Sequence, residues 1–458
     1  MPSEPLRVAI VGSGPSGFYA AAELIKKLGP DVWVCMIDRL PTPFGLVRSG
    51  VAPDHPKIKS VTSLFTRTAA HPCFHFLGGV EIGRDITHDE LRGFFNAVVY
   101  ATGAAADRGL EIPGTGLDGC FGGSDFVRWY NGHPDQRLLP VDLEVERAVV
   151  VGNGNVALDI ARILTTPVAE LERTDIAEHA LDALSRSRIR EVVVLGRRGP
   201  AQAAWTSPEL IELGKLADVD VTVQGMDDPA ALVPEANAAN ANSVESNVQI
   251  VRELADRGVS GAAKSIRLKF CSVPTAFSGE ECVRAVVAAD TRLSVGADRR
   301  VRAELTGVVE TIAAGLVVTA VGHRSEAPFG VPLDGRGTIR NQAGRVIDGD
   351  RPVAGVYVAG WAKRGASGVI GTNKLCAVGT VRALLEDLES GILPRNRTVP
   401  ADFDDLCRRR AAADYTDWMG WQRIDEFEVS AGLAVTRPRL KLTDLADMRA
   451  HARAASSE

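Results

Sequence analysis

The chain has 458 residues and a formal net charge of −6, with 45% hydrophobic and 24% charged residues. This length predicts two large domains or three smaller ones, and the balanced composition excludes a disordered or fibrous protein. The negative charge argues against a general nucleic-acid binder. No apolar stretch reaches the roughly 18 residues of a membrane span, and the N-terminal residues lack the pattern of a secretory signal. Glycine is the outlier, with 45 residues.

The seven cysteines are scattered along the chain, and no two form a Cys-x-x-Cys pair. A disulfide framework, a Cys-ligated zinc site or an iron–sulfur cluster needs closer groupings. We therefore expect a reduced, cytoplasmic protein without a metal site.

The first glycine cluster is Gly12-x-Gly14-x-x-Gly17, which follows the apolar run RVAIV and opens a helical pattern. A second apolar run, VWVCMI, ends at Asp38, which lies 38 − 17 = 21 residues beyond the last glycine. This order of strand, glycine turn, helix and acid is typical of a dinucleotide site. In such a site the acid accepts hydrogen bonds from the ribose hydroxyls. A glycine triplet alone can also be an ordinary turn, and this context argues against that alternative.

The second cluster, Gly152-x-Gly154-x-x-Ala157, has the same context, but its second strand ends at Arg197-Arg198. Two guanidinium groups can pair with a 2′-phosphate, so this site is expected to prefer NADP over NAD. The structural alternative is a solvated arginine pair. The separation of 197 − 152 = 45 residues exceeds the usual spacing of about 20. We assign the excess to an insertion at 165–188.

The remaining elements follow in chain order. The region 225–263 is predicted to be a surface loop with one short helix, and strands are expected at 316–322 and 355–361. A helix should begin near Gly368, and the tail after 400 has a polar, helical pattern. Short strands alternating with helices predict an α/β fold with parallel sheets covered by helices. Two dinucleotide sites indicate a flavoprotein with resident FAD and transient NADPH, whose domains should face each other across a cleft.

Four segments in a fixed order carry a family resemblance: LPTPFGLVRSGVAPDHPKIK (40–59), VGNGNVALDIAR, VLGRRGP and GWAKRGASGVIGTNK. With them, nearly the whole chain resembles the adrenodoxin reductase-like family of NADPH–ferredoxin reductases. The resemblance implies a glutathione-reductase-type layout of two Rossmann-like domains, with the NADP domain inserted into the FAD domain. The expected FAD domain comprises residues 1–104 and 326–458, and the expected NADP domain comprises residues 105–325.

The resemblance also implies which residues bind the cofactors. The implied FAD contacts are Gly12, Gly14, Ser16, Gly17, Asp38, Gly45, Leu46, Ile82, Trp361, Gly368, Val369 and Ile370. The implied NADP(H) contacts are Arg108, Gly152, Asn153, Gly154, Asn155, Val156, Arg197, Arg198 and Glu209, together with Gly368. The chain departs from the family by having Asp38 where Glu is frequent and Ala366-Ser367 where Pro-Thr is frequent; both changes should matter little.

Hydride transfer between nicotinamide and flavin needs no protein nucleophile, so the candidate catalytic residues are polar neighbours of the rings. His55 stands between Pro53 and Pro56, which stiffen its loop. The resemblance implies that Glu212 pairs with His55 and keeps the imidazole protonated. Asp159 is a further candidate. The structural alternatives are an ordinary histidine and a solvated acid on a helix.

As electron acceptor, the resemblance implies an acidic ferredoxin-type iron–sulfur protein, bound by a basic face. The candidates for that face are Arg252, Arg257, Lys264, Arg267, Lys269, Lys363 and Arg364, although scattered solubility charges are the alternative for each. We expect a monomer that binds no nucleic acid.

Rival functions also need consideration. A disulfide reductase needs a close cysteine pair beside the flavin, and an electron-feeding subunit of an amidotransferring reductase usually carries cysteine clusters; this chain has neither. A flavin mono-oxygenase and a non-catalytic NADP sensor or scaffold remain open.

Overall fold

A computed structural model shows that the chain divides into two compact units. The first unit comprises residues 1–106 and 322–458, and the second comprises residues 107–321. The structure describes residues 4–104, 106–232, 241–298, 300–325, 330–335, 337–368, 370–394 and 400–453. Within these residues, no helix combines the length and apolarity needed to cross a bilayer.

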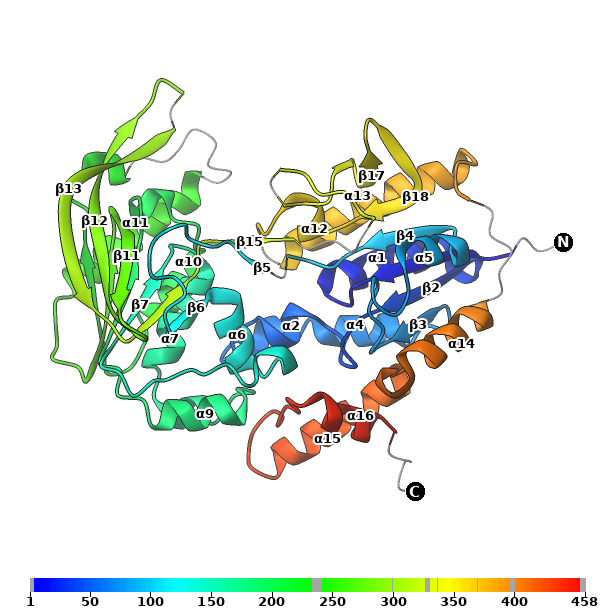
Figure 1. Ribbon diagram of the computed structural model, residues 1–458, viewed down its shortest axis with the longest axis horizontal. Helices are drawn as coiled ribbons and strands as arrows, with labels where there is room; N and C mark the ends of the chain where they lie inside the picture. Colours follow the sequence, from blue (N-terminus) through cyan, green and yellow to red (C-terminus); the bar gives the residue numbers. More distant parts are fainter. Residues whose placement is uncertain are drawn as a thin grey trace. The chain divides into compact units, whose positions relative to one another are not determined.

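The first unit is built on a seven-stranded sheet in the order β16-β17-β18-β4-β1-β2-β3 (Figure 1). The central strands run parallel, whereas β16 and β17 continue from β18 as an antiparallel edge. The strands are β1 (Leu6–Val11), β2 (Val32–Ile37), β3 (Phe74–Leu77), β4 (Ala97–Tyr100), β16 (Asn341–Gln342), β17 (Arg345–Asp348) and β18 (Arg351–Val358). Two short segments, β5 (Ala106–Asp107) and β15 (His323–Arg324), pair separately.

The helices of this unit cover both faces of the sheet. They are α1 (Pro15–Leu28), α2 (Leu46–Ser49), α3 (Pro56–Lys59), α4 (Thr62–Ala69), α5 (His88–Phe94), α12 (Trp361–Arg364), α13 (Ile370–Glu389), α14 (Pro400–Ala411), α15 (Trp418–Leu433) and α16 (Leu445–Arg453), with 3-10 turns at Gly29–Asp31 and Ala412–Asp414. On one face, Val8 and Ile10 pack with α1 and α13; on the other, Ala9 and Val11 pack with α5 and α14. Strands buried on both faces explain why these runs are almost entirely apolar.

The second unit contains a parallel six-stranded sheet in the order β6-β14-β7-β8-β10-β9. Its strands are β6 (Cys120–Gly122), β7 (Arg147–Val151), β8 (Glu191–Leu195), β9 (Val219–Gln224), β10 (Lys264–Lys269) and β14 (Leu316–Thr319). Its helices are α6 (Gly123–Asn131), α7 (Asn155–Thr165), α8 (Val168–Leu171), α9 (Glu178–Ser185), α10 (Ser207–Leu213) and α11 (Ala241–Asp256), with 3-10 turns at Pro134–Gln136, Pro200–Gln202 and Pro229–Leu232.

Among the described residues, helices cover one face of this second sheet and strands cover the other, which differs from the prediction of helices on both faces. Val150 and Val194 pack with the helices, whereas Val149 and Val193 face a three-stranded antiparallel sheet. That sheet is formed by β11 (Ser272–Gly279), β12 (Val283–Val295) and β13 (Val301–Ala313). It buries Phe277, Val286 and Ile312 against the parallel strands, as a layer of helices would.

Two other sequence predictions can be compared with the structure. The short helix predicted within 225–263 is the 16-residue α11, and residues 233–240 of that region lie outside the described residues. The insertion at 165–188 contains α8 and α9. These two helices pack against each other, and α9 also packs on α6.

Candidate nucleotide-binding sites

In the first unit, two of the three glycines of the first cluster are required by packing. Gly12 has φ +104°, and a Cβ there would lie 2.6 Å from the carbonyl oxygen of Ala101. The Gly12 N–H donates to the Ile37 oxygen at 2.8 Å, which joins the turn to β2. A Cβ on Gly17 would collide with the oxygen of Gly12, so the third glycine lets α1 approach the turn.

The middle glycine, Gly14, is different, because a Cβ built on it meets no protein atom within 4 Å. Gly14 is the N-cap of α1, and no side chain of the described residues caps this helix. Open space in front of uncapped backbone N–H groups is what a phosphate group requires. The turn can therefore hold the pyrophosphate of a dinucleotide.

Asp38 follows β2 and is tied to the same turn. Its carboxylate accepts hydrogen bonds from the Ser13 N–H (2.9 Å), the Ser13 hydroxyl (2.5 Å) and the Leu40 N–H (3.0 Å). Sequence reasoning found Asp38 but missed Ser13. Ser13 could have been predicted, because its hydroxyl follows β1 and Asp38 follows the neighbouring parallel strand β2.

The loop at Gly45 lies beside this turn. The Phe44 N–H donates to the Ser13 oxygen at 3.0 Å, and a Cβ on Gly45 (φ +49°) would lie 3.0 Å from the Cα of Gly14. Leu46 then begins α2. The structure thus brings Gly14, Gly45 and Leu46 together, although they are separated by a helix and a strand in the sequence.

Residues near 360 reach the same place from the second part of the unit. Gly360 has φ +71°, and a Cβ on it would collide with the hydroxyl of buried Ser16. Trp361 begins α12, and its indole N–H donates to the Ser367 oxygen at 3.2 Å. Gly368 (φ +76°) precedes α13, which starts at Ile370.

Two further predicted FAD contacts are Val369 and Ile82. Val369 lies outside the described residues. Ile82 lies in a turn that is closed by a hydrogen bond from the Gly83 N–H to the Ile86 oxygen, and it packs against the core cluster that contains Val80. The Val80 N–H donates to the Asp38 backbone oxygen at 3.0 Å, which links this segment to the end of β2.

In the second unit, the second glycine cluster repeats the design of the first. Gly152 has φ +141°, and a Cβ there would collide with the oxygen of Ala320. Its N–H donates to the Leu195 oxygen at 2.9 Å. Gly154 caps α7 and faces open space, whereas Ala157 is completely buried. The turn can therefore hold a second phosphate group.

The asparagines of the second turn are bound to neighbouring loops. The side chain of Asn153 covers Gly196, where a Cβ would collide with its amide, and the Asn153 oxygen accepts from the Ala204 N–H at 2.7 Å. Asn155 Oδ1 accepts from the Thr206 N–H at 2.8 Å. Val156, which follows, is half-buried against the helical core of the unit. These bonds fix the second turn before any ligand binds.

The arginine pair lies next to this turn, because β7 and β8 are parallel and Val151 pairs with Leu195. The Arg197 oxygen accepts from the Thr291 hydroxyl at 2.8 Å, and the Arg198 oxygen accepts from the Cys271 N–H at 3.3 Å. The backbone of the pair is thus held by Thr291 on β12 and by Cys271, which directly precedes β11, while the Arg197 side chain is exposed. Arg108, near the start of the unit, is exposed as well.

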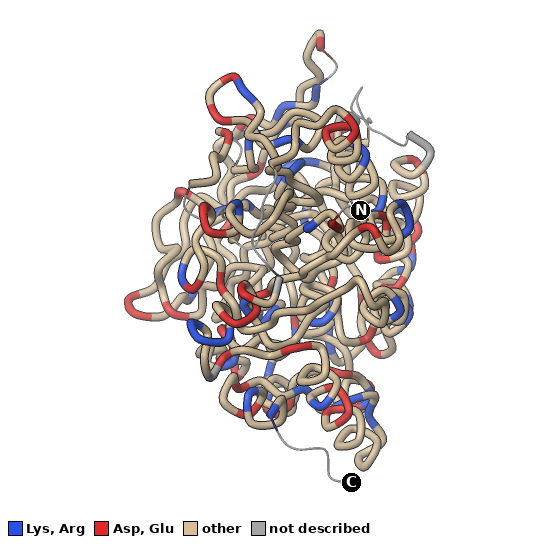
Figure 2. The backbone as a smooth tube through the Cα atoms, turned by 90° about the vertical axis from the view of Figure 1, so that its right-hand side faces the viewer, with Lys and Arg blue, Asp and Glu red and all other residues tan. Residues whose placement is uncertain are grey.

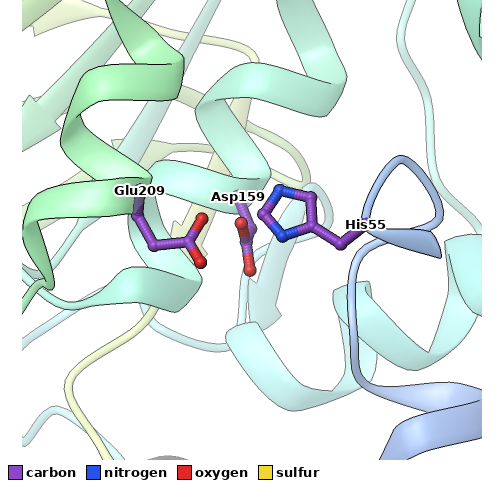
Figure 3. A group of neighbouring side chains, drawn as sticks. All are labelled: His55, Asp159 and Glu209. Atoms are coloured by element: carbon purple, nitrogen blue, oxygen red, sulfur yellow. The ribbon is translucent and has the colours of Figure 1, made fainter. Parts of the chain in front are cut away.

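In the second unit, Asp159 and Glu209, which are drawn in Figure 3, both pair with the buried side chain of Arg162. Arg162 lies 2.7 Å from Asp159 Oδ1, one turn earlier on α7, and 3.4 Å from Glu209 Oε2 on α10. Its side chain is only 4% exposed, so these two acids balance a buried charge. Asp159 is therefore not a simple solvated acid. Sequence reasoning missed Arg162, although its position three residues after Asp159 was a usable signal.

His55 belongs to the first unit, where it caps the one-turn helix α3 (Figure 3). Its N–H donates to the Ala52 oxygen at 3.1 Å, and its Nε2 lies 3.8 Å from Asp54 Oδ1. Glu212 lies on α10 of the second unit, half-exposed, and forms an ion pair with Lys215 at 2.8 Å. The predicted pairing of His55 with Glu212 joins two units and stays a prediction.

The residues predicted to form a basic face differ in their partners. Arg267 lies 3.1 Å from Glu191, and Lys269 lies 2.8 Å from Glu310 on β13, so their charges are partly neutralised within the unit. Lys264 donates to the Leu164 oxygen at 3.1 Å, and burial lowers its pKa. Arg257 donates to the Gly214 oxygen at 2.6 Å. Figure 2 shows Lys and Arg interspersed with Asp and Glu along the chain.

Two of the three remaining candidates for that face, Lys363 and Arg364, lie near the Gly360 turn of the first unit. Lys363 donates to the Thr380 hydroxyl at 3.2 Å, and Arg364 donates to Asn373 at 2.6 Å. Both side chains are half-buried. Arg252, on α11, is mostly exposed.

Comparison with known proteins gives consistent results. Residues 6–193 match the family model described as pyridine nucleotide-disulphide oxidoreductase. The chain is 44% identical to NADPH-ferredoxin reductase FprA of Mycobacterium tuberculosis over 456 residues, covering 97% of this chain and 98% of the relative. It is 39% identical to the mitochondrial NADPH:adrenodoxin oxidoreductase of Arabidopsis thaliana, covering 98% and 96%. The solved structure of Mycobacterium tuberculosis FprA in complex with NADPH superposes with a TM-score of 0.92 at 43% identity, covering 98% of this chain and 100% of that one.

Proposed function

Because this chain belongs to the family of NADPH–ferredoxin and NADPH:adrenodoxin reductases, we propose that it is an FAD-dependent NADPH–ferredoxin reductase. The observation that carries the proposal is the pair of glycine turns, each with an open middle glycine at a helix N-terminus. FAD held in this way would supply the chemistry, because a flavin can accept a hydride from NADPH and pass single electrons to a ferredoxin-type iron–sulfur protein.

We assign FAD to the first unit, with domain bounds of 1–104 and 326–458. Gly14 and the first N–H groups of α1 bind the pyrophosphate, because only there does the turn leave space in front of the helix. Asp38 accepts hydrogen bonds from the ribose hydroxyls, using carboxylate lone pairs that are not taken by Ser13 and Leu40. Trp361, which begins α12, and Ile370, which begins α13, contact the flavin from the second part of the unit. Ser16 and Gly360 are supported as neighbours by their close approach.

We assign NADP(H) to the second unit, with domain bounds of 105–325. Gly154 and the start of α7 bind the pyrophosphate in the same way. Arg197 and Arg198 pair with the 2′-phosphate, and their position two and three residues past Leu195, where the neighbouring strand β8 ends, supports this role. Arg108, Asn153 and Glu209, with Asn155 and Val156, complete the proposed site.

His55, Glu212 and Asp159 are proposed to hold the reacting rings and their protons rather than to attack them. Hydride transfer depends on alignment and electrostatics, which polar side chains can supply. Arg162 pairs with both Asp159 and Glu209 and so fixes their carboxylates relative to α7 and α10. His55 is presented by a loop whose backbone is closed by its own hydrogen bonds.

The partner is proposed to be an acidic ferredoxin-type protein, and the chain is proposed to act as a monomer in the cytoplasm. Lys363 and Arg364 are the candidates of the proposed basic face that lie on the Gly360 turn. Arg267 and Lys269 are weaker candidates, because acids of the same unit already pair with them.

The proposed function is tested with the purified protein. We expect yellow flavin absorbance, and NADPH oxidation that is fast with ferricyanide or a ferredoxin and slow with oxygen alone. A colourless protein without diaphorase activity would instead indicate an NADP sensor or scaffold. Fast oxygen consumption coupled to an organic substrate would indicate a mono-oxygenase.

A further inference from the structure

We propose that the C-terminal segment 417–442 is a clamp that holds the α2 turn against the first glycine turn and so determines how tightly FAD is retained. Arg48 and Glu428 are its positioning residues. The proposal deepens the assigned function, because it rests on FAD binding at the first glycine turn.

The centre of the clamp is a buried carboxylate. Glu428, on α15, is completely buried, and its two oxygens accept from the Arg48 guanidinium at 2.5 and 2.8 Å. Arg439 donates to it at 3.1 Å, and the Leu442 N–H donates at 2.8 Å. A buried charge is costly unless it is paired and hydrogen-bonded, and here four donated hydrogen bonds satisfy it. Loss of Glu428 would leave Arg48 without its main partner.

Arg48 is held at its backbone as well as at its side chain. Its carbonyl oxygen accepts from Lys441 Nζ at 3.1 Å, and its guanidinium lies 5.4 Å from the ring centroid of Trp421. All of these partners belong to the C-terminal segment. The segment therefore fixes the position of α2 and not only the rotamer of one arginine.

The α2 turn in turn lies against the proposed FAD site. It begins at Leu46 directly after Gly45, which closely approaches the Cα of Gly14. Phe44, just before it, donates to the Ser13 oxygen at 3.0 Å and packs edge-to-face on Trp421 with centroids 5.6 Å apart. A four-residue helix is not stable by itself, so its position depends on such tertiary contacts.

After α15 the chain reverses direction and runs back along the helix, which brings Arg439 and Leu442 to Glu428. At the end of α15 the chain turns back, and the oxygen of Gly432 in the last turn of the helix accepts from the Arg437 N–H at 2.9 Å. The Leu440 N–H then donates to the Glu428 backbone oxygen at 2.8 Å. This return places Arg439 and Lys441 beside α15.

The test compares Glu428→Gln with Glu426→Gln, which changes an exposed acid on the same helix. The rate of FAD release from the holoenzyme is followed by the recovery of flavin fluorescence on dilution in buffer at pH 7. We expect Glu428→Gln to release FAD at least roughly tenfold faster, because the variant leaves the buried Arg48 charge without its carboxylate partner. NADP⁺ affinity and the Glu426→Gln variant should match the wild type.

A further control separates clamping from general loss of stability. Phe403→Leu opens a cavity under α14, on the other face of the sheet. At equal loss of stability against urea, the clamp predicts faster FAD release in Glu428→Gln and an unchanged rate in Phe403→Leu. Equal acceleration in both variants would overturn it. If Glu428→Gln does not fold, Arg48→Lys, which keeps the charge but loses the two-pronged contact, takes its place.

The outcomes also separate this inference from the proposed function. A wild-type protein that neither contains nor binds FAD would refute both. A wild-type protein that holds FAD, with a folded Glu428→Gln or Arg48→Lys variant that releases it within twofold of the wild-type rate, would refute the clamp alone.

Discussion

The carboxylate of Asp38 accepts two hydrogen bonds from Ser13, one from its N–H at 2.9 Å and one from its hydroxyl at 2.5 Å. This contact ties the end of β2 to the first glycine turn. The acid proposed to bind the FAD ribose is thus positioned by the protein itself, which reduces the entropy lost when a ligand binds.

The glycines of the first turn should respond differently to the same substitution. Gly14→Ala adds a methyl group into open space, so we expect a normally folded protein that binds FAD at least roughly tenfold more weakly, since the methyl group occupies the path of the pyrophosphate. Gly17→Ala drives a methyl group into the Gly12 oxygen, so we expect a loss of about 1–3 kcal/mol in unfolding free energy. Urea unfolding and FAD titration measure the two effects. Equal FAD affinity in Gly14→Ala and wild type would contradict the pyrophosphate assignment.

His55→Gln should slow flavin reduction by NADPH or weaken NADP⁺ binding, while FAD stays bound, because the imidazole is proposed to act on the rings and not on the glycine turn. Stopped-flow reduction and NADP⁺ titration measure both effects. His71→Gln, a change in the loop before β3, is the control. The role assigned to His55 is wrong if both quantities keep their wild-type values.

Replacing Arg197 and Arg198 with glutamine should reduce the preference for NADPH over NADH by at least roughly tenfold, or about 1.4 kcal/mol. The physical reason is the loss of two charges that pair with the 2′-phosphate. The ratio of kcat/KM for the two nucleotides gives the result. Arg186→Gln, in the insertion before β8, provides an exposed control on the same unit. An unchanged ratio would show that the pair is only solvated charge.

Acid should weaken the first unit through Glu428. Burial by itself would raise the pKa of this carboxyl, but Arg48 and Arg439, with the Leu442 N–H, outweigh burial and lower the pKa below its ordinary value of 4.5. The folded form therefore binds fewer protons than the unfolded form, and the stability supplied by the carboxylate is present above pH 4.5 and lost as the pH falls below it.

The charged groups around Glu428 are Arg48, Arg439, Lys441 and Asp425, which also pairs with Arg439. We expect Glu428→Gln to be less stable than wild type at pH 7 and the difference to shrink toward pH 3.5, about one unit below the ordinary glutamate value. Urea midpoints across this range provide the measurement. A difference that grows as the pH falls would contradict the lowered pKa.

Salt should affect the reaction with the protein partner but not the reaction with a small acceptor. If a basic face steers an acidic ferredoxin, its reduction should slow as ionic strength rises, since exposed charges are screened within about 10 Å at 0.1 M salt. Ferricyanide reduction at saturating concentration serves as the comparison. Equal salt dependence of the two reactions would argue against a basic docking face.

Local pattern was enough to predict the parts of the fold that position the proposed sites. The spacing of Gly12, Gly14 and Gly17 predicted a strand–turn–helix, because Gly17 approaches the Gly12 oxygen within the turn and Gly14 stays open at the start of the helix. The contact of Gly12 with the Ala101 oxygen is long-range and could not be read from the spacing. In the second cluster, Gly154 is likewise open, and the close contact of Gly152 is with the distant residue Ala320. The 45 residues between Gly152 and Arg197 do not move the arginine pair away from the second glycine turn. The insertion forms two helices of its own, and β7 still pairs with β8.

Contacts between distant residues could not be predicted from pattern. The pairing of Arg48 with Glu428 spans 428 − 48 = 380 residues, and nothing near either residue indicates the other. The antiparallel sheet β11–β13 was missed because the alternation of its strands shows one buried face without showing what it covers. The tail was predicted as polar and helical, yet Trp421 is buried against Arg48 and Phe44.

The most direct measurement is anaerobic mixing of the purified protein with NADPH, followed by addition of an oxidised ferredoxin. We predict that the yellow flavin absorbance bleaches with NADPH, much more slowly with NADH, and returns when the ferredoxin is added. A protein that carries FAD but does not bleach with NADPH, or that bleaches and passes no electrons to any ferredoxin while ferricyanide restores the colour, would contradict the proposed function.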